Sequence, residues 1–242
     1  MQLLSTDAFE GLDAVHGFTT RVGGLSLARS ERLPDAELAE NWERVAAEFG
    51  LSAADVALLT QVHGAKVVRV TEPSGPLNTL DEADAMWTDR TGVLLAVRVA
   101  DCVPVLLAAP GGVAVAHAGW RGVAAQVVRA AVEALCHGIG VDPEHVCASV
   151  GPHISGARYE VGQEVVDGLG ASGLDESVFV RPGTRGRPHV DLGAAVGAQL
   201  EAVGVGRVRH LGACTYSESR FHSYRRDGPA SGRLAGVIVR MA

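Results

Sequence analysis

Long apolar runs in the middle of the chain predict the strands of a buried sheet. Residues 93–99 and 103–108 are β-branched, near-continuous apolar runs, which are typical of strands buried on both faces. A third run, residues 112–116, leads directly into His117. Weaker strand patterns are present at residues 16–26, 58–70, 146–150, 207–211 and 234–239.

Apolar residues with helical spacing predict helices around these strands. Residues 34–50 carry one apolar stripe, which consists of Leu38, Trp42, Val45 and Phe49. A second helix is expected from Gly122 to Gly138, and its apolar face comprises Ala124, Val127, Val128, Ala131 and Leu135. Further helices are expected at residues 163–169 and, behind an Asp191 N-cap, up to residue 203.

Composition indicates a globular protein with a core built mainly from alanine, valine and leucine. The chain has 242 residues, enough for one large domain or two small ones, and 47% of them are hydrophobic but only 5% aromatic. Its four cysteines, in a chain of this size, are expected to be thiols or metal ligands rather than a disulfide framework. Cys136 and Cys147 are expected in the core.

Charge and segment patterns exclude several classes of partner. The net charge of −7 argues against binding to nucleic acid, although a few local arginines can still hold a small anion. There is no run of about 18 apolar residues that would cross a membrane, and the N-terminus does not have the pattern of a signal peptide. A cytoplasmic protein acting on a small molecule is therefore expected.

Several polar residues stand next to predicted turns. Arg21 lies beside a Gly-Gly turn, where it is either part of a surface loop or an anion contact, and Asn41 lies off the stripe of its helix. Residues 81–89 are acidic and are expected to form a solvated turn. Pro104 follows Cys102 closely, which predicts a kinked backbone that presents the thiol out of line with the sheet. Residues 219–232 are expected to form a basic loop whose arginines either bind phosphate or are solvated.

The most specific chemistry lies in His63, Cys102 and His117. Imidazole and thiolate are zinc ligands, and a catalytic zinc site has three protein ligands and an open fourth position. Two alternatives stay open from the residues alone: a Cys/His nucleophile and base without metal, or a Cys102 that is simply part of the core. The nine histidines include no His-x-His pair, so the copper array of a multicopper oxidase is disfavoured.

Motifs along nearly the whole chain resemble those of one known family. The matching stretches are FTTRVGGLS, TQVHG, ADAMWTD, ADCVPVLL, AHAGWRG, GPHISGARYEVG, CTYS and FHSYRRDGPASGR. They resemble the bacterial laccase-domain family, also called YfiH-like or multicopper polyphenol oxidase-like. The resemblance implies one α/β (α+β) domain over residues 1–242, with mixed sheets flanked by helices, similar to the fold of cysteine-dependent toxin deamidases.

The resemblance also implies a zinc-dependent purine nucleoside phosphorylase that can deaminate adenosine and cleave methylthioadenosine. It assigns Zn²⁺ to His63, Cys102 and His117. We expect Arg121, with Arg21 or Arg225, to hold phosphate, because arginine binds it through two parallel N–H groups. Gln61 and Asn41 are expected to bind the ribose or the base.

Other functions remain alternatives at this stage. The family resemblance also allows a peptidoglycan editing hydrolase that removes L-serine from UDP-muramyl precursors. A metal-independent Cys/His hydrolase, an interaction module with a structural zinc, and polyphenol oxidation are further alternatives. The chain departs from the family pattern in its short segment 27–37, in His153 and in Ala109, and the first departure concerns the expected substrate lid.

Overall fold

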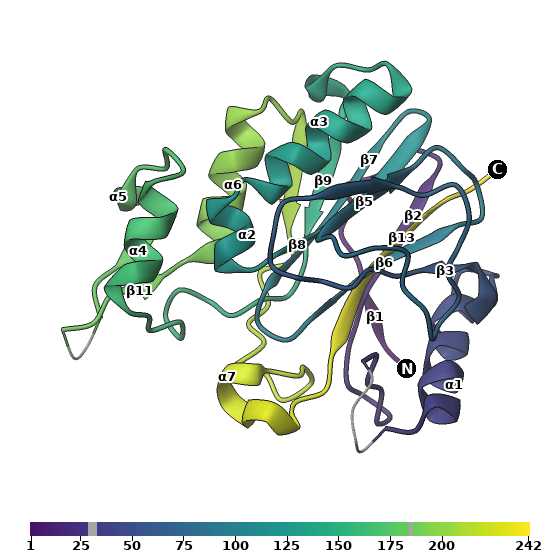
Figure 1. Cartoon of the computed structure of the whole chain (residues 1–242), viewed down its shortest axis with the longest axis horizontal. Helices are drawn as coiled ribbons and strands as arrows, with labels where there is room; N and C mark the ends of the chain where they lie inside the picture. The colour runs from purple at the N-terminus through teal and green to yellow at the C-terminus, as the bar shows by residue number, and fades with distance from the viewer. Residues whose placement is uncertain (29–32, 184–185) are drawn as a thin grey trace.

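A computed structural model gives the structure of residues 1–28, 33–183 and 186–242 (Figure 1). Residues 29–32 belong to the short segment in which the substrate lid was expected, and that part of the expectation lies outside the described residues. No helix in the described ranges is both long enough and apolar enough to cross a membrane.

Two mixed β-sheets form the centre of the molecule. The first has the strand order β1 (Leu3–Leu4), β2 (Ala14–Thr19), β13 (Leu234–Arg240), β6 (Leu94–Val99) and β3 (Val56–Ala57). The second has the order β12 (Arg207–His210), β9 (Cys147–Val150), β7 (Val103–Ala109), β8 (Gly112–Ala118), β5 (Ala85–Thr88) and β4 (Val67–Arg69). Each sheet combines parallel and antiparallel pairs, as the family resemblance implied.

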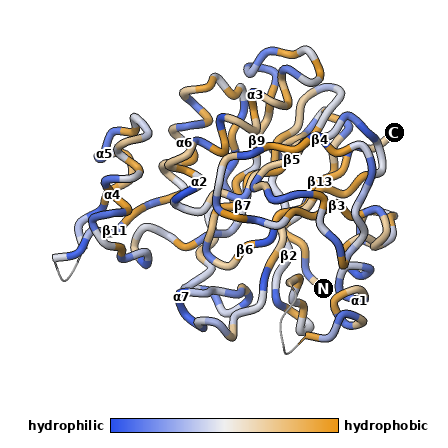
Figure 2. Tube along the Cα trace, viewed as in Figure 1, coloured by the Kyte–Doolittle hydropathy of each residue, from blue (hydrophilic) through white to orange (hydrophobic). Residues whose placement is uncertain are grey.

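The two sheets pack face to face, and this explains the near-continuous apolar runs. In β7, Leu106 and Ala108 point toward the first sheet, whereas Val105 and Leu107 point to the helices on the other side. Strands β6, β8 and β13 alternate in the same way between two apolar layers. Figure 2 shows the apolar strands inside and the polar residues concentrated in the outer loops. The prediction of strands buried on both faces is confirmed.

Helices cover the outer face of each sheet. Helix α1 (Asp35–Ala47) covers the first sheet and buries the predicted stripe. The second sheet is covered by α2 (Trp120–Ala124), α3 (Val127–Ile139), α4 (Gln163–Gly170) and α6 (Leu192–Ala202). The smaller elements are α5 (Glu176–Phe179), the hairpin of β10 (Val180–Arg181) and β11 (His189–Val190), α7 (Tyr224–Asp227), and the 3₁₀ turns η1 (Ala53–Asp55), η2 (Pro143–His145) and η3 (Gly228–Ala230).

Three expectations about local structure were wrong. The single helix after Gly122 is divided into α2 and α3 at Gln126, whose φ of 61° is left-handed. The acidic stretch 81–89 is not a solvated turn, because residues 85–88 form the buried strand β5. The basic segment 219–232 is not all loop, because Ser223 caps the short helix α7. Asp191 does cap α6, as predicted.

Candidate active site

His117 is the most rigidly held member of the candidate site. It lies in β8, in register with Pro104 of the neighbouring strand β7, and its side chain is buried. Its Nδ1 lies 2.7 Å from a carboxylate oxygen of Asp84. Since Asp84 engages Nδ1, the other ring nitrogen, Nε2, is the one left for a ligand.

Asp84 connects two parts of the site that are far apart in sequence. Its carboxylate accepts hydrogen bonds from the backbone N–H groups of Val62, His63 and Gly64 at 3.1, 2.9 and 2.6 Å, in addition to that from His117. Burial opposes ionisation of this carboxyl, but hydrogen bonds from His117 and Gly64 outweigh it and lower its pKa. Asp84 therefore fixes both the strand histidine and the loop histidine.

Sequence reasoning missed Asp84. It was grouped with the acidic run 81–89, although Asp84 is fully buried and the two neighbouring acids, Asp81 and Glu82, are exposed. One signal could have found it: alanines flank Asp84 directly before an apolar strand. A carboxylate in such a position has to be paired if it is buried.

Asp101, the residue before Cys102, has an unusual backbone conformation. Asp101 has a φ of 94°, which is rare for a residue with a side chain. The backbone is bent at residues 100–102, as expected near Cys102, but Pro104 is not the cause, because it pairs with His117 inside β7 and its carbonyl accepts from Gly151. Asp101 is held by its own contacts: its carboxylate accepts from the Thr215 hydroxyl and the Arg225 backbone, both at 2.6 Å. The turn that presents the thiol is thus fixed from the C-terminal part of the chain.

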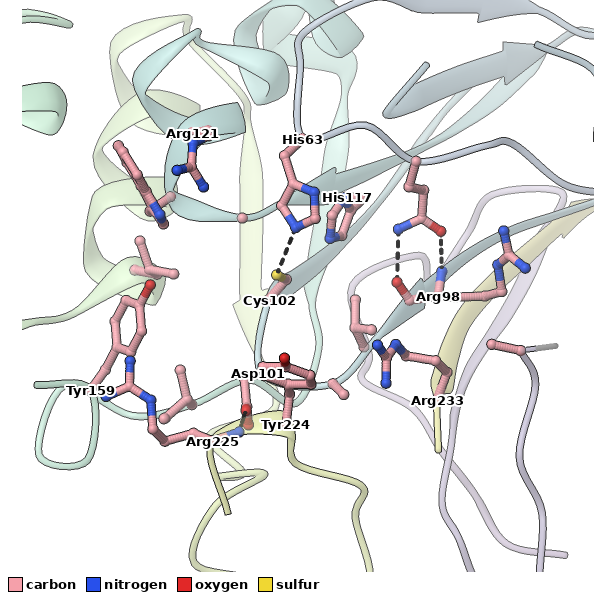
Figure 3. Close-up of a pocket in the computed structure, with 18 of the residues that line it drawn as sticks. His63, Arg98, Asp101, Cys102, His117, Arg121, Tyr159, Tyr224, Arg225 and Arg233 are labelled. Atoms are coloured by element: carbon pink, nitrogen blue, oxygen red, sulfur yellow. Dashed lines mark hydrogen bonds between the residues drawn. The ribbon is translucent and has the colours of Figure 1, made fainter. Parts of the chain in front are cut away.

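His63, Cys102 and His117 form one cluster. Their ligand atoms all lie within 4.8 Å of one another, and His63 Nε2 lies 4.0 Å from Cys102 Sγ (Figure 3). The cluster opens to solvent on one side, since His63 is exposed, Cys102 is half-buried and His117 is buried. Gly119 permits this approach, because a Cβ there would lie 2.7 Å from His63 Cδ2 and 3.2 Å from Cys102 Sγ.

The cluster fits a metal ion. Tetrahedral zinc, with bonds of about 2.1 Å to nitrogen and about 2.3 Å to sulfur, places a nitrogen and a sulfur ligand about 3.6 Å apart, so the 4.0 Å between His63 Nε2 and Cys102 Sγ requires only a small approach of the two side chains. The Asp84–His117 contact is the carboxylate–histidine pair that commonly orients a metal ligand. Among the described residues, no other group of three or more potential ligands is brought together.

The cluster also changes the protonation of its own members. Burial opposes ionisation of the Cys102 thiol, but His117 and His63 outweigh burial and lower its pKa to about 6. Burial also opposes protonation of His117, but Cys102 and Asp84 together raise its pKa. Cys102 is therefore a thiolate at neutral pH, which is the form that either binds metal or acts as a nucleophile.

The cluster lies in a cavity of about 570 Å³ that is rich in arginine. The charged and aromatic residues of its lining are Arg98, Arg121, Arg225, Arg233, Asp101, Trp120, Tyr159 and Tyr224. Within the described part of the chain, none of the four arginines forms an ion pair. A protein of net charge −7 thus contains a cavity that favours anions.

The structure brings some of the other candidate residues into this cavity and leaves two outside it. Arg121 and Arg225 line the cavity, with their guanidinium groups stacked on Trp120 and Tyr159 at 4.3 and 5.1 Å. Gln61 also lines it, but its amide is engaged in two 2.8 Å hydrogen bonds with the Arg98 backbone.

Asn41 and Arg21 do not line the cavity. Asn41 is buried and donates to the Ser26 carbonyl, while its oxygen accepts from Arg44. Arg21 lies 3.8 Å from the Asp227 carboxylate. In this structure both residues therefore have structural partners, and their role in substrate binding stays a prediction.

The four cysteines are free, as expected. Cys136 is buried in α3, and Cys147, although it lies in a strand, is only half-buried. Cys136 adjoins His137 in the sequence, but neither belongs to the cluster. The sulfur available to the cavity is that of Cys102.

Residues 15–241 match the family model described as multi-copper polyphenol oxidoreductase laccase. The chain belongs to this family. It is 43% identical over 232 residues to a purine nucleoside phosphorylase from Deinococcus radiodurans, covering 92% of this chain and 88% of that protein. It is 33% identical over 210 residues to a protein named adenosine deaminase RL5, covering 81% and 79%.

Solved structures of the family share the fold. The structure of YfiH from Bacillus licheniformis has a TM-score of 0.91 at 27% identity and covers 98% of this chain and 96% of its own. YlmD from Geobacillus stearothermophilus has a TM-score of 0.87 at 31% identity and covers 98% and 94%. The family resemblance and the mixed α/β fold read from the sequence motifs are confirmed.

Proposed function

We propose that this protein is a zinc-dependent purine nucleoside phosphorylase that converts inosine or adenosine and phosphate into a free purine and ribose 1-phosphate. One observation carries the proposal: a three-ligand cluster opens into a cavity lined by arginines without ion pairs and by aromatic rings. The relatives named purine nucleoside phosphorylase support the same class of small-molecule substrate.

His63, Cys102 and His117 would hold the metal ion, and Asp84 would keep His117 in the tautomer that leaves Nε2 available. A zinc ion held there would supply a Lewis acid that can polarise an oxygen of the substrate or of water. Among the described residues, the exposed face of the cluster meets the cavity and no fourth ligand group, which leaves room for such an oxygen.

Arg121 and Arg225 are the proposed phosphate-binding residues. Both guanidinium groups border the cavity and stack on aromatic rings, which limits their orientations and preserves their N–H groups for an anion. Arg225 is further positioned because its backbone N–H donates to Asp101 and its side chain donates to the Glu160 carbonyl. Preorganised donors of this kind lower the cost of aligning phosphate.

The aromatic residues of the cavity provide a surface for a planar base. Trp120, Tyr159 and Tyr224 all line it, and ring stacking on a purine contributes about 1–3 kcal/mol per base. In phosphorolysis, a phosphate oxygen forms a bond to C1′ as the C1′–N9 bond breaks. The bonding electron pair passes to the purine, which takes up a proton and leaves as the free base.

The test is to incubate metal-replete protein with inosine and phosphate and to measure hypoxanthine and ribose 1-phosphate. We expect both products in equal amounts, and neither from Cys102→Ala. Hypoxanthine with free ribose, or no hypoxanthine above the Cys102→Ala background, would contradict phosphorolysis.

Adenosine deamination is the second candidate, and the relative named adenosine deaminase favours it. Adenosine separates the two reactions, since deamination gives inosine and ammonia whereas phosphorolysis gives adenine. The deamination product forms without phosphate, so omitting phosphate from the assay distinguishes the two activities in one experiment.

A further inference from the structure

We propose that Arg98 and Arg233 form a second anion subsite in the cavity, and that it binds the phosphate of a phosphorylated nucleoside substrate. This inference rests on the proposed function, because it names the class of nucleoside that the same cavity takes. It assigns a role to two arginines that phosphorolysis of an unmodified nucleoside does not require.

The fold brings these two arginines to the same end of the first sheet. Arg98 lies in β6 opposite Ala235 of β13, and Arg233 precedes β13 by one residue. Both side chains are half-buried and both line the cavity. Burial, and then the positive charge of Arg233, lower the pKa of Arg98. The two positive charges therefore lie close enough to affect each other, and an anion bound in this part of the cavity would offset both.

Neither arginine has a carboxylate partner among the described residues. Arg98 donates from Nη2 to the Leu59 carbonyl, and Arg233 donates from Nη1 to the carbonyls of Ser231 and Gly232. Neutral carbonyls do not compensate these charges, and each guanidinium keeps further N–H groups. Asp101 is the acidic residue of the described lining, and its two oxygens are engaged by Thr215 and Arg225.

The Arg98–Arg233 pair is separate from the proposed phosphate site of phosphorolysis. In Figure 3, Arg121 and Arg225 lie on one side of Cys102 and His63, whereas Arg98 and Arg233 lie on the other side. The two pairs also differ in exposure, since Arg121 and Arg225 are exposed. The Gln61 amide holds the Arg98 backbone in place through two hydrogen bonds.

The chemistry of the reaction points to the source of the second anion. Phosphorolysis uses one inorganic phosphate, and an unmodified purine nucleoside carries no charge. A second cationic pair in the same cavity therefore suits an anionic group on the nucleoside itself. A phosphomonoester, as in a nucleoside 5′-monophosphate, suits a site with two guanidinium groups because its oxygens accept charge-assisted hydrogen bonds.

The experiment measures equilibrium binding of inosine and of inosine 5′-monophosphate to metal-replete protein by calorimetry, without phosphate so that no turnover occurs. The variants are Arg233→Gln, Arg233→Lys and the matched control Arg129→Gln. Arg129 lies on the exposed surface of α3, and its partner among the described residues is Glu133, so the control removes the same charge outside the cavity. Melting temperatures establish that each variant is folded.

We expect wild-type protein and Arg129→Gln to bind the monophosphate at least tenfold more tightly than inosine. Arg233→Gln should lose this preference with little change in inosine affinity, and Arg233→Lys should retain part of it. Equal affinity of the wild-type protein for the two ligands would overturn the proposal, as would an undiminished preference in Arg233→Gln.

Inorganic phosphate provides the remaining arm of the test. If Arg233→Gln weakens only the binding of inorganic phosphate, the pair serves free phosphate, and the proposed substrate class is wrong. The outcome is independent of catalysis: a protein that binds the monophosphate through Arg233 but releases no purine refutes the proposed function and leaves this subsite standing.

Discussion

The two histidines of the candidate metal site are held in opposite ways. His117 lies inside a six-stranded sheet, is buried, and has a strand partner on each side. His63 lies on an exposed loop between strands and has a left-handed φ of 62°. Strand pairing and burial hold the backbone of the first, whereas the backbone of the second is held by hydrogen bonds that its loop donates to Asp84.

At the site itself, Asp84 holds both histidines, although one belongs to a strand and the other to a loop. One carboxylate holds the His117 ring and three consecutive N–H groups of the loop that carries His63. The geometry of the cluster therefore depends on a buried polar group that is shared by a rigid strand and a loop.

The largest effect is expected from replacing each histidine separately. His117→Ala and His63→Ala should each lower phosphorolysis by about a thousandfold, because the Lewis acid contributes several kcal/mol. Only His117→Ala should also lower the free energy of unfolding of the metal-free protein, by about 1–3 kcal/mol, since it leaves a buried carboxylate without one partner. Kinetics and denaturant unfolding in chelator measure the two quantities. An equal loss of stability in both variants would contradict the proposed difference between the buried His117 and the exposed His63.

Asp84→Asn tests the shared carboxylate. It keeps the shape of the side chain but removes its charge and one acceptor, so it should weaken zinc affinity by about 10–100-fold. A competition titration with a chromogenic chelator measures this affinity. Asp81→Asn is the matched control, because Asp81 is exposed and pairs with Lys66. Unchanged zinc affinity in Asp84→Asn would show that the carboxylate does not position His63 and His117 for the metal ion.

Gly119→Ala should disturb the loop side of the cluster and spare the strand side. The new Cβ would lie 2.7 Å from His63 and would displace that ring, while His117 is not among its nearest contacts. We expect a smaller loss of zinc affinity than in Asp84→Asn, of about tenfold. Gly64→Ala is the control, since its Cβ would make only ordinary contacts from 3.7 Å. Equal affinities of the two variants would mean that the approach at Gly119 is unimportant.

The sequence predicts the buried strands better than the hydrogen bonds between residues that are distant in the chain. Residues 93–99 and 103–108 read as strands because their burial on both faces makes every position apolar, and this pattern is local. The three metal-ligand candidates also converge as expected. Asp84 was missed because its partners lie 20–33 residues away, so its neighbours in sequence suggested solvent.

Two other positions are also decided by contacts between distant segments. Asn41 is off the apolar stripe of α1 and nevertheless buried, because the segment containing Ser26 covers it. The break between α2 and α3 lies at Gln126, where no glycine or proline marks it, and Gln126 also donates to the Ser172 carbonyl. Contacts between distant segments decide such positions, and periodicity along the chain does not record them.

The smallest effect is expected at His16, a partly buried histidine outside the site. Burial lowers its pKa to about 4, so the folded state favours the neutral ring. Because the unfolded chain binds the proton more readily, this contribution to stability is complete above pH 6.5 and is lost as the pH falls toward 4. Unfolding at pH 7 and pH 4 should differ by on the order of 1–2 kcal/mol more in wild-type protein than in His16→Gln, because partial exposure of the ring reduces the full effect of the pKa shift. The same pH dependence of the free energy of unfolding in both proteins would contradict a lowered pKa of His16.

X-ray absorption spectroscopy of the zinc-loaded protein directly tests whether His63, Cys102 and His117 bind one ion with an open fourth position. We expect one ion per chain, bound by one sulfur, two imidazole nitrogens and one light atom whose distance changes when inosine and phosphate are added. The sulfur signal should disappear in Cys102→Ser. A spectrum with no sulfur ligand, or a fourth position filled by a protein group that substrate does not affect, would contradict it.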